Sequence, residues 1–254
     1  MNYLTAVHTD VGIRKKTNQD SALVMEATTD KGNVLLTVVC DGMGGANGGN
    51  IASALAVKVI SDRINVSYRE QMRDSSIKNM LDSALNAANV EVFDLAQSKA
   101  ELNGMGTTVV CAIVKNGQVF IAHAGDSRAY ILKNGNITQL TTDHSMVQDL
   151  LDRGKITSEE ALHHPNKNII TRAVGVDKNI DIDFDETDLD DESTLLLCTD
   201  GLSNYVSNDE ILELTSDGKH YAFADRLVNK ANENGGKDNI AVIVIEPFTD
   251  EVNV

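Results

Sequence analysis

Cysteines and long apolar runs are both scarce in this sequence. The three cysteines, Cys40, Cys111 and Cys198, lie far apart, and each stands within an apolar run. An odd, scattered set fits reduced, buried thiols better than a disulfide framework, so we expect a cytoplasmic protein. No apolar run approaches the length of a membrane span, and residues 1–5 show no basic segment followed by an apolar core. We therefore expect neither insertion into a membrane nor a signal peptide.

Basic residues are also in short supply, since 22 lysines and arginines stand against 38 aspartates and glutamates, a formal net charge of −16. A general electrostatic footprint for a polyanion needs the opposite balance, so we expect no nucleic-acid partner. The 42% of hydrophobic residues is ordinary for a folded globular protein, and 254 residues can bury the core of one large domain or of two small ones.

Strand and helix patterns alternate along the chain without an obvious linker. Asn116-Gly117 and Asn134-Gly135 each separate two apolar strand candidates by two residues, which is the strongest local hairpin signal. Consecutive hairpins predict an antiparallel sheet rather than a doubly wound parallel one. Antiparallel strands with segregated helices predict an α+β fold. Helices are predicted at 51–64, 77–96 and 221–232, and strands at 3–9, 21–28, 34–40, 107–115, 118–124, 129–133 and 137–140.

The stretch from residue 144 to residue 174 differs from the rest of the chain. It is polar, contains a short helical piece near 158–162 and is interrupted by Pro165. Such an insertion is either an ordinary connection or a mobile flap over a site, and its position favours the flap.

Two apolar strands each run directly into an Asp-Gly pair, which is the most informative feature of the sequence. The pairs are Asp41-Gly42 and Asp200-Gly201, and a further aspartate, Asp238, precedes the apolar run 240–245. Strand ends hold their residues rigidly, and carboxylates brought together at a sheet edge repel one another unless a cation lies between them. The Gly42 carbonyl oxygen could serve as a further ligand for a hard cation. The pattern predicts a metal site.

Two further segments carry charged groups that could join such a site. Residues 14–20 read Arg-Lys-Lys-Thr-Asn-Gln-Asp, which is usually a solvated loop. Near a pair of metals, one of these cations could bind a phosphoryl oxygen, and Asp20 could orient a metal-bound water. Asp126 ends another strand, where an aspartate is commonly a local hydrogen-bond acceptor. As a fourth converging carboxylate it would serve a further metal.

Four other kinds of site fit the sequence less well. The glycine-rich segment 41–49 lacks the Lys-Ser or Lys-Thr of a phosphate-binding loop, and the six histidines lack zinc-ligand spacing. No cysteine has the arginine six residues later that a cysteine-based phosphatase requires. A calcium loop at 181–192 would have Glu186 where its turn needs glycine, so a half-buried strand fits better. For His144 we expect hydrogen bonding rather than catalysis.

A series of short motifs runs in order along almost the whole chain. They are NQD (18–20), DGMGG (41–45), GMGTT (104–108), GDSRAY (125–130), TDHS (142–145), HPNKNIITRAVG (164–175), CTDGLS (198–203) and KDNIAV (237–242). Together they resemble the metal-dependent type 2C (PPM) serine/threonine protein phosphatases in their compact bacterial form. The resemblance implies a four-layer α/β/β/α sandwich, in which two packed antiparallel β-sheets are flanked by helices on both outer faces and carry a flap insertion. It also implies a single catalytic domain over 1–248, with the flap at about 144–174, and a short tail at 249–254.

The resemblance further implies a centre of two core Mn²⁺ or Mg²⁺ ions with a third ion beside them. By motif position, Asp41 would bridge both core ions and the Gly42 carbonyl would bind one of them. Asp200 and Asp238 would hold the other core ion. The implied reaction is attack on phosphorus by a hydroxide that bridges the two metals.

The resemblance also assigns roles to four further positions. At two of them the residue differs from the one that family members, or their eukaryotic branch, usually carry. Asp126 matches the position of the third metal, and Asp20 matches an acid behind the metal ligands. The phosphate-binding arginine of the family corresponds here to Lys15, with Arg14 one residue earlier, so either cation could bind the phosphate. Met43 replaces a histidine of eukaryotic relatives and cannot donate a proton.

The function implied is hydrolysis of phosphoserine and phosphothreonine in proteins, in opposition to a bacterial Ser/Thr kinase. The expected partners are phosphorylated proteins, that kinase and its substrates, and the expected state is a cytoplasmic monomer. Two alternatives remain open. One is a catalytically weak pseudophosphatase that serves as a binding or regulatory module, although every metal aspartate is present. The other is a metal hydrolase of small phosphorylated substrates.

Overall fold

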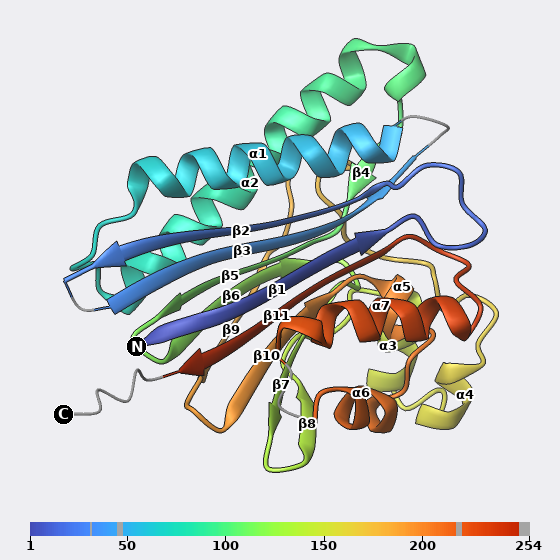
Figure 1. Ribbon diagram of the computed structural model, residues 1–254. Coiled ribbons are helices and arrows are strands. Elements are labelled where there is room, and N and C mark those ends of the chain that lie inside the picture. Colours follow the sequence, from blue (N-terminus) through green and yellow to red (C-terminus); the bar gives the residue numbers. More distant parts are fainter. Residues whose placement is uncertain (31, 45–47, 217–219, 249–254) are drawn as a thin grey trace.

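Two antiparallel β-sheets packed face to face form the centre of the protein (Figure 1). The computed structural model describes residues 1–30, 32–44, 48–216 and 220–248. The predicted tail, 249–254, and residues 45–47 of the glycine-rich segment therefore lie outside the described residues.

The first sheet has five strands in the order β1 (Asn2–Asp10), β11 (Ile240–Phe248), β10 (Ser193–Cys198), β7 (Arg128–Lys133) and β8 (Asn136–Gln139). The second has the order β2 (Asp20–Thr29), β3 (Gly32–Met43), β5 (Val109–Lys115), β6 (Gln118–Ala124) and β9 (Asp183–Asp188), with β4 (Gly106–Thr107) also paired to β3.

The two predicted hairpin turns are confirmed. Asn116 and Gly117 have φ values of 51° and 77°, and Asn134 and Gly135 have φ values of 52° and 71°. Two successive positive φ angles match the right-handed twist of the flanking strands, and asparagine and glycine tolerate them best. These turns fix the registers of β5 with β6 and of β7 with β8.

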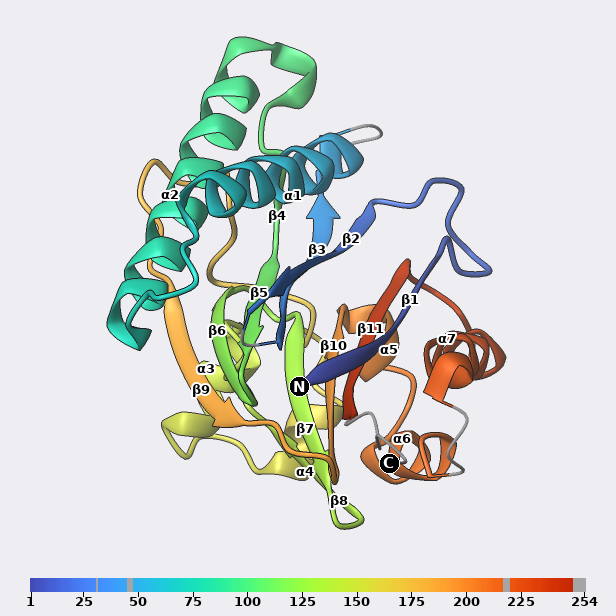
Figure 2. The same cartoon turned by 60° about the vertical axis from the view of Figure 1, so that its left-hand side comes forward.

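Helices cover both outer faces of the sandwich. The long helices α1 (Gly48–Ser67) and α2 (Asp74–Ser98) lie over the six-stranded sheet, and α5 (Asp200–Ser203), α6 (Asn208–Leu214) and α7 (Phe223–Glu233) lie on the side of the five-stranded sheet (Figures 1 and 2). Single-turn helices η1 (Ala100–Leu102) and η2 (His220–Ala222) complete these layers. Three buried apolar clusters separate the four layers, one between the sheets and one under each helical layer. The predicted α+β sandwich is confirmed.

The segment between β8 and β9 carries two short helices, α3 (Met146–Asp152) and α4 (Ser158–Leu162). The sequence pattern predicts α4 but not α3 or α6, because a helix of about two turns has too few apolar positions to show a period. Local capping defines these helices instead, since Ser145 and Ser207 accept backbone N–H groups at their first turns. The predicted strand 107–115 is interrupted at Thr108, whose backbone N–H donates to Asp41 O at 2.9 Å.

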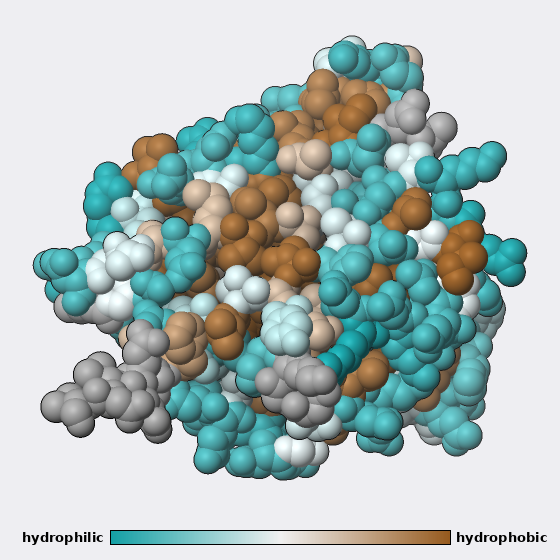
Figure 3. All heavy atoms as spheres, in the orientation of Figure 1, coloured by the Kyte–Doolittle hydropathy of each residue, from teal (hydrophilic) through white to brown (hydrophobic). Residues whose placement is uncertain are grey.

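The surface over β1 and β2 is the more apolar part of the face shown in Figure 3. Leu4 and Val7 of β1 are 43% and 46% exposed. No helix in the described part of the chain is long and apolar enough to cross a membrane.

Candidate metal centre

Five aspartates come together at one end of the sandwich, and both sheets contribute to them. Asp41 lies near the end of β3 and faces Asp20, the first residue of β2, in the strand register. Asp200 begins α5 two residues after the end of β10, and Asp238 lies two residues before β11. Asp126 occupies the turn between β6 and β7. Because strands from both sheets end here, residues up to 218 positions apart in sequence share one small region.

A cavity of about 250 Å³ opens at this point. Four of the aspartates line it, whereas Asp20 is 8% exposed and lies behind Asp41. The other lining groups are Lys15, Gln19, Gly42, Met43, Gly44, Thr108, Asn168 and Ile170. The last two come from the connection between β8 and β9, so this connection reaches the cavity.

Glycines at the strand ends allow the backbone to approach closely. A Cβ atom on Gly42 would lie 2.0 Å from Gly49 O, and one on Gly49 would lie 2.5 Å from Gly42 O. The Gly42 carbonyl therefore stays clear of side chains only because both positions are glycine. At Gly201 a Cβ would lie 1.8 Å from Asn239 O. In each Asp-Gly pair, the aspartate supplies a carboxylate and the glycine lets the adjacent backbone pack tightly, which fixes the position of that carboxylate.

The clustered carboxylates carry the electrostatic signature of a cation site. Burial, reinforced by neighbouring aspartates, raises the pKa of Asp20 to about 8 and that of Asp126 to about 7. The same two causes raise the pKa of Asp41 well above its ordinary value, and they also raise the pKa of Asp200. In the described part of the chain, Asp20 Oδ1 and Asp200 Oδ1 are buried without a hydrogen-bond partner. Unpartnered oxygens among mutually repelling carboxyls fit a divalent cation.

The donor set also indicates which cations would fit. All candidate donors are carboxylate or carbonyl oxygens, which suit Mg²⁺ and Mn²⁺. The three cysteines are buried within the sandwich. The residues present therefore fit a centre of hard divalent ions.

Lys15 and Arg14, the two cations considered for phosphate binding, lie in different places. Lys15 lines the cavity, and its Nζ forms an ion pair with Asp238 Oδ1 at 2.5 Å. Burial would lower the pKa of Lys15, but Asp238, Asp41 and Asp200 outweigh it and raise that pKa. The Arg14 side chain is absent from the lining of the cavity, and its backbone N–H donates to Gly236 O at 3.2 Å. The geometry therefore favours Lys15.

Asn239 holds the loop that carries Lys15, a role that the sequence analysis did not assign. Its Oδ1 accepts the Gln19 N–H at 2.8 Å, and its Nδ2 donates to Val11 O at 2.8 Å and to Thr17 O at 3.0 Å. The side chain is thus bonded to both ends of the segment 11–19. The KDN motif pointed to this residue only as the neighbour of Asp238.

Two threonines support the carboxylates in a similar way. Thr199 Oγ1 donates to Asp20 Oδ2 at 2.8 Å and accepts the Ala241 N–H at 2.9 Å. Thr108 Oγ1 accepts the Asp41 N–H at 3.0 Å and lies 2.6 Å from Ser127 Oγ. These bonds link strand ends of different parts of the chain, and no local sequence signal distinguishes such threonines from ordinary strand residues.

A second, larger cavity of about 550 Å³ adjoins the first, because Asp126 and Asp200 line both. It lies against α3, α4 and α5, with Arg128 and Lys167 among its cationic lining residues. Arg128 does not pair with Asp126; it forms two bonds to Asp143, of 2.8 and 2.7 Å. The carboxylate cluster is therefore open to this larger cavity.

A β-sandwich whose end presents clustered oxygen donors beside a cation fits the class of metal-dependent phosphatases. The chain belongs to the protein phosphatase 2C family, whose profile matches residues 12–244. It is 40% identical over 242 residues to the serine/threonine phosphatase stp of Listeria monocytogenes, covering 94% of this chain and 93% of that protein.

Among solved structures, the chain is likewise similar to bacterial phosphatases. The serine/threonine phosphatase Stp1 of Staphylococcus aureus superposes with a TM-score of 0.88 at 36% identity, over 96% of this chain and 95% of that one. The catalytic domain of the phosphatase PstP, in complex with two manganese ions, superposes with a TM-score of 0.82 at 31% identity, over 96% and 97% of the two chains.

Proposed function

We propose that this protein is a serine/threonine protein phosphatase that hydrolyses phosphoserine and phosphothreonine with Mn²⁺ or Mg²⁺. The observation that carries the proposal is the aspartate cluster at the cavity, with two buried, unpartnered carboxylate oxygens beside the Lys15 ammonium. The serine/threonine phosphatases among its relatives support the same substrate class.

The carboxylates are assigned to the metal ions by their motif positions, and the fact that four of them line one cavity supports this assignment. Asp41 and the Gly42 carbonyl, with Asp200 and Asp238, would hold two ions, and Asp126 with Asp200 would hold a third. Bound Mn²⁺ or Mg²⁺ supplies charge neutralisation for the phosphoryl oxygens and a lowered pKa for a water molecule.

The protein's own groups then position the substrate. The Lys15 ammonium, released from Asp238, binds a phosphoryl oxygen as a point charge and holds the phosphorus in the cavity. Asp20, behind Asp41 and hydrogen-bonded to Thr199, is the acceptor that orients a water molecule within the cluster. Burial and the neighbouring carboxylates raise the pKa of Asp20 to about 8, so nearby cations would favour its ionised form, which only accepts hydrogen bonds.

The substrate is a segment of a phosphorylated protein. The larger cavity that shares Asp126 and Asp200 with the metal cavity takes the residues next to the phosphorylated side chain. The connection from β8 to β9 borders both cavities and serves as the flap predicted at about 144–174. The protein acts as a monomer in the cytoplasm and opposes a Ser/Thr kinase, whose substrates it dephosphorylates.

Hydrolysis of p-nitrophenyl phosphate tests the chemistry, with Mn²⁺, with Mg²⁺ and with excess EDTA, beside Asp238→Ala and Asp41→Ala. Metal-dependent turnover that either substitution reduces to the EDTA level is the expected result. Near-normal turnover in either variant would disprove the ligand assignment. A folded protein that is inactive with every metal would favour the pseudophosphatase alternative. Comparison of a phosphothreonine peptide with a small phosphate ester then tests the substrate class.

A further inference from the structure

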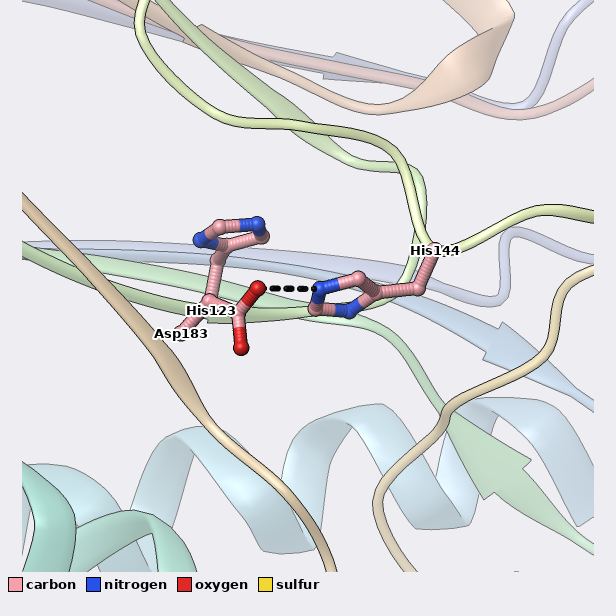
Figure 4. A group of neighbouring side chains, drawn as sticks. All are labelled: His123, His144 and Asp183. Carbon is pink, nitrogen blue, oxygen red and sulfur yellow. Dashed lines mark hydrogen bonds and ion pairs between the residues drawn. The ribbon is translucent and has the colours of Figure 1, made fainter. Parts of the chain in front are cut away.

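A cluster of two histidines, an aspartate and an arginine lies behind the turn that carries Asp126. Figure 4 shows His123, His144 and Asp183, whose potential ligand atoms all lie within 4.8 Å of one another. However, Arg172 Nη1 donates to Asp183 Oδ1 at 2.8 Å and lies 3.1 Å from His144 Nε2. A permanent guanidinium charge at the centre of the group opposes a metal ion there. The cluster therefore has another role.

His144 holds both backbone polar groups of Gly125. The Gly125 N–H donates to His144 Nδ1 at 3.1 Å, and the His144 N–H donates to Gly125 O at 2.9 Å. Gly125 has a φ of +115°, and a Cβ atom there would lie 2.6 Å from Thr108. This unusual backbone conformation immediately precedes Asp126, so its geometry sets the direction of the Asp126 carboxylate.

The contacts of His144 also determine its tautomer. Because Nδ1 accepts the Gly125 N–H, the proton of the neutral ring lies on Nε2, which donates to Asp183 Oδ2 at 3.1 Å. Arg172 donates to the other oxygen of the same carboxylate. Burial, with His123 and Arg172 nearby, lowers the pKa of His144 despite Asp183, which agrees with a neutral ring. His123 stacks on this ring, with 4.8 Å between centroids and 11° between planes.

The same residue joins the two ends of the β8–β9 connection. The Thr171 N–H donates to His144 O at 2.8 Å, and Ser145 pairs with Ile170 in an isolated antiparallel bridge. Arg172, at the returning end, reaches Asp183 at the start of β9. The two ends of the connection are therefore hydrogen-bonded to each other at His144, the residue that also holds the turn before Asp126.

We propose that His144 is a positioning residue, oriented by Asp183 and Arg172, which fixes the Gly125–Asp126 turn and couples it to the β8–β9 connection. A displacement of the connection would then move the Asp126 carboxylate, and occupancy of the Asp126 metal position would favour the closed connection. This inference rests on the proposed function only through the role of Asp126 as a metal ligand.

Two substitutions at His144 separate its contacts. In His144→Asn the side-chain oxygen occupies about the place of Nδ1 and can still accept the Gly125 N–H. In His144→Gln the side chain can reach Asp183, but no acceptor remains at the place of Nδ1. Amide hydrogen exchange is measured on the metal-free proteins, together with Mn²⁺ titration and p-nitrophenyl phosphate kinetics. Asp188→Asn, an exposed position on β9, is the control.

His144→Gln should accelerate exchange at residues 124–127 by roughly tenfold or more, whereas His144→Asn should change it by less than about threefold. His144→Gln should also weaken the Mn²⁺ affinity of the Asp126 position and lower kcat by roughly tenfold with little change in KM. Equal exchange in both variants, or wild-type Mn²⁺ binding in His144→Gln, would overturn the proposal.

A second variant keeps the test decisive if the His144 variants do not fold. Asp183→Asn alters a side chain that is 47% exposed and removes the charge that attracts Arg172. It should accelerate exchange both at residues 124–127 and at 169–172, and acceleration at only one of them would contradict the coupling. If the wild-type protein shows no turnover with any metal, the proposed function fails, while exchange in the metal-free proteins still decides the positioning role.

Discussion

Asn239→Ala is the substitution whose effect can be worked out most directly from the structure. Asn239 is 2% exposed and makes three hydrogen bonds to backbone groups of residues 11–19. Removal of the side chain leaves one N–H donor and two carbonyl acceptors without their partner. An unsatisfied buried group costs about 1–3 kcal/mol. Water can reach part of this loop, so we expect the lower end for each group, a total of about 3 kcal/mol.

For a chain of this size, 1 kcal/mol shifts the melting temperature by about 2–4 °C, so Asn239→Ala should lower it by roughly 6–12 °C. Release of the loop should also raise KM for p-nitrophenyl phosphate, because Lys15 lies within it. The assay combines thermal unfolding with steady-state kinetics on the same preparations. Asn136→Ala, at an exposed position of β8, is the matched control and should stay within about 0.5 kcal/mol of wild type.

Asn239→Asp separates the two kinds of contact. The carboxylate can still accept the Gln19 N–H but cannot donate to the carbonyls of Val11 and Thr17. Its melting temperature should therefore lie at or below that of Asn239→Ala. If Asn239→Ala melts within 2 °C of wild type and keeps its KM, the reasoning is refuted and the loop is held by other contacts.

Three further predictions concern the same end of the sandwich. Lys15→Ala should raise KM by roughly tenfold, because one charge-assisted contact to the phosphate is lost. Arg14→Ala should raise KM by less than about twofold. The reverse order in steady-state kinetics would assign the phosphate contact to Arg14. Unfolded carboxyls titrate near pH 4, whereas the pKa values of Asp20 and Asp126 are raised to about 8 and 7. Between these limits the folded, metal-free protein holds more protons than the unfolded chain, so its stability should fall as pH rises. In EDTA the melting temperature should be several degrees lower at pH 8.5 than at pH 6, and Mn²⁺ should remove most of this difference; equal values in EDTA would contradict the assignment. Gly201→Ala would place a Cβ 1.8 Å from a backbone carbonyl oxygen and should cost about 2–3 kcal/mol in urea unfolding; an unchanged midpoint would show that the backbone relaxes freely there.

The fold could be predicted from the sequence where local signals are strong. β6 begins and ends at the predicted residues, and the Asn-Gly turns beside β6 and β7 have the expected backbone angles. The helix α3 was missed because its seven residues contain too few apolar positions to establish a period. The segment 181–192, considered as a calcium loop, contains the strand β9, as its alternating pattern predicted.

The candidate site could be predicted only in part, for a physical reason. Asp41, Asp200 and Asp238 are visible in the sequence because apolar strands lead to or from them. The role of Asn239 is not visible, because it bonds to Gln19, a residue 220 positions earlier. The choice between Lys15 and Arg14 depends on the path of one exposed loop, which no periodicity encodes. Long-range hydrogen bonds and loop paths are properties of the assembled sandwich.

The site draws its oxygen donors from both sheets, so the complete set of donors is present only when the two sheets are packed together. Asp41 and Gly42 belong to one sheet, whereas Asp200 and Asp238 stand at strand ends of the other. A chain that has formed each sheet separately therefore holds only part of the donor set, and a fragment that lacks either β3 or the segment 200–238 loses at least one donor. Bound ions would therefore link the two sheets and stabilise their packing on each other. A chain that ends before Asp238 would lack part of the donor set, and we expect it to have no metal-dependent turnover.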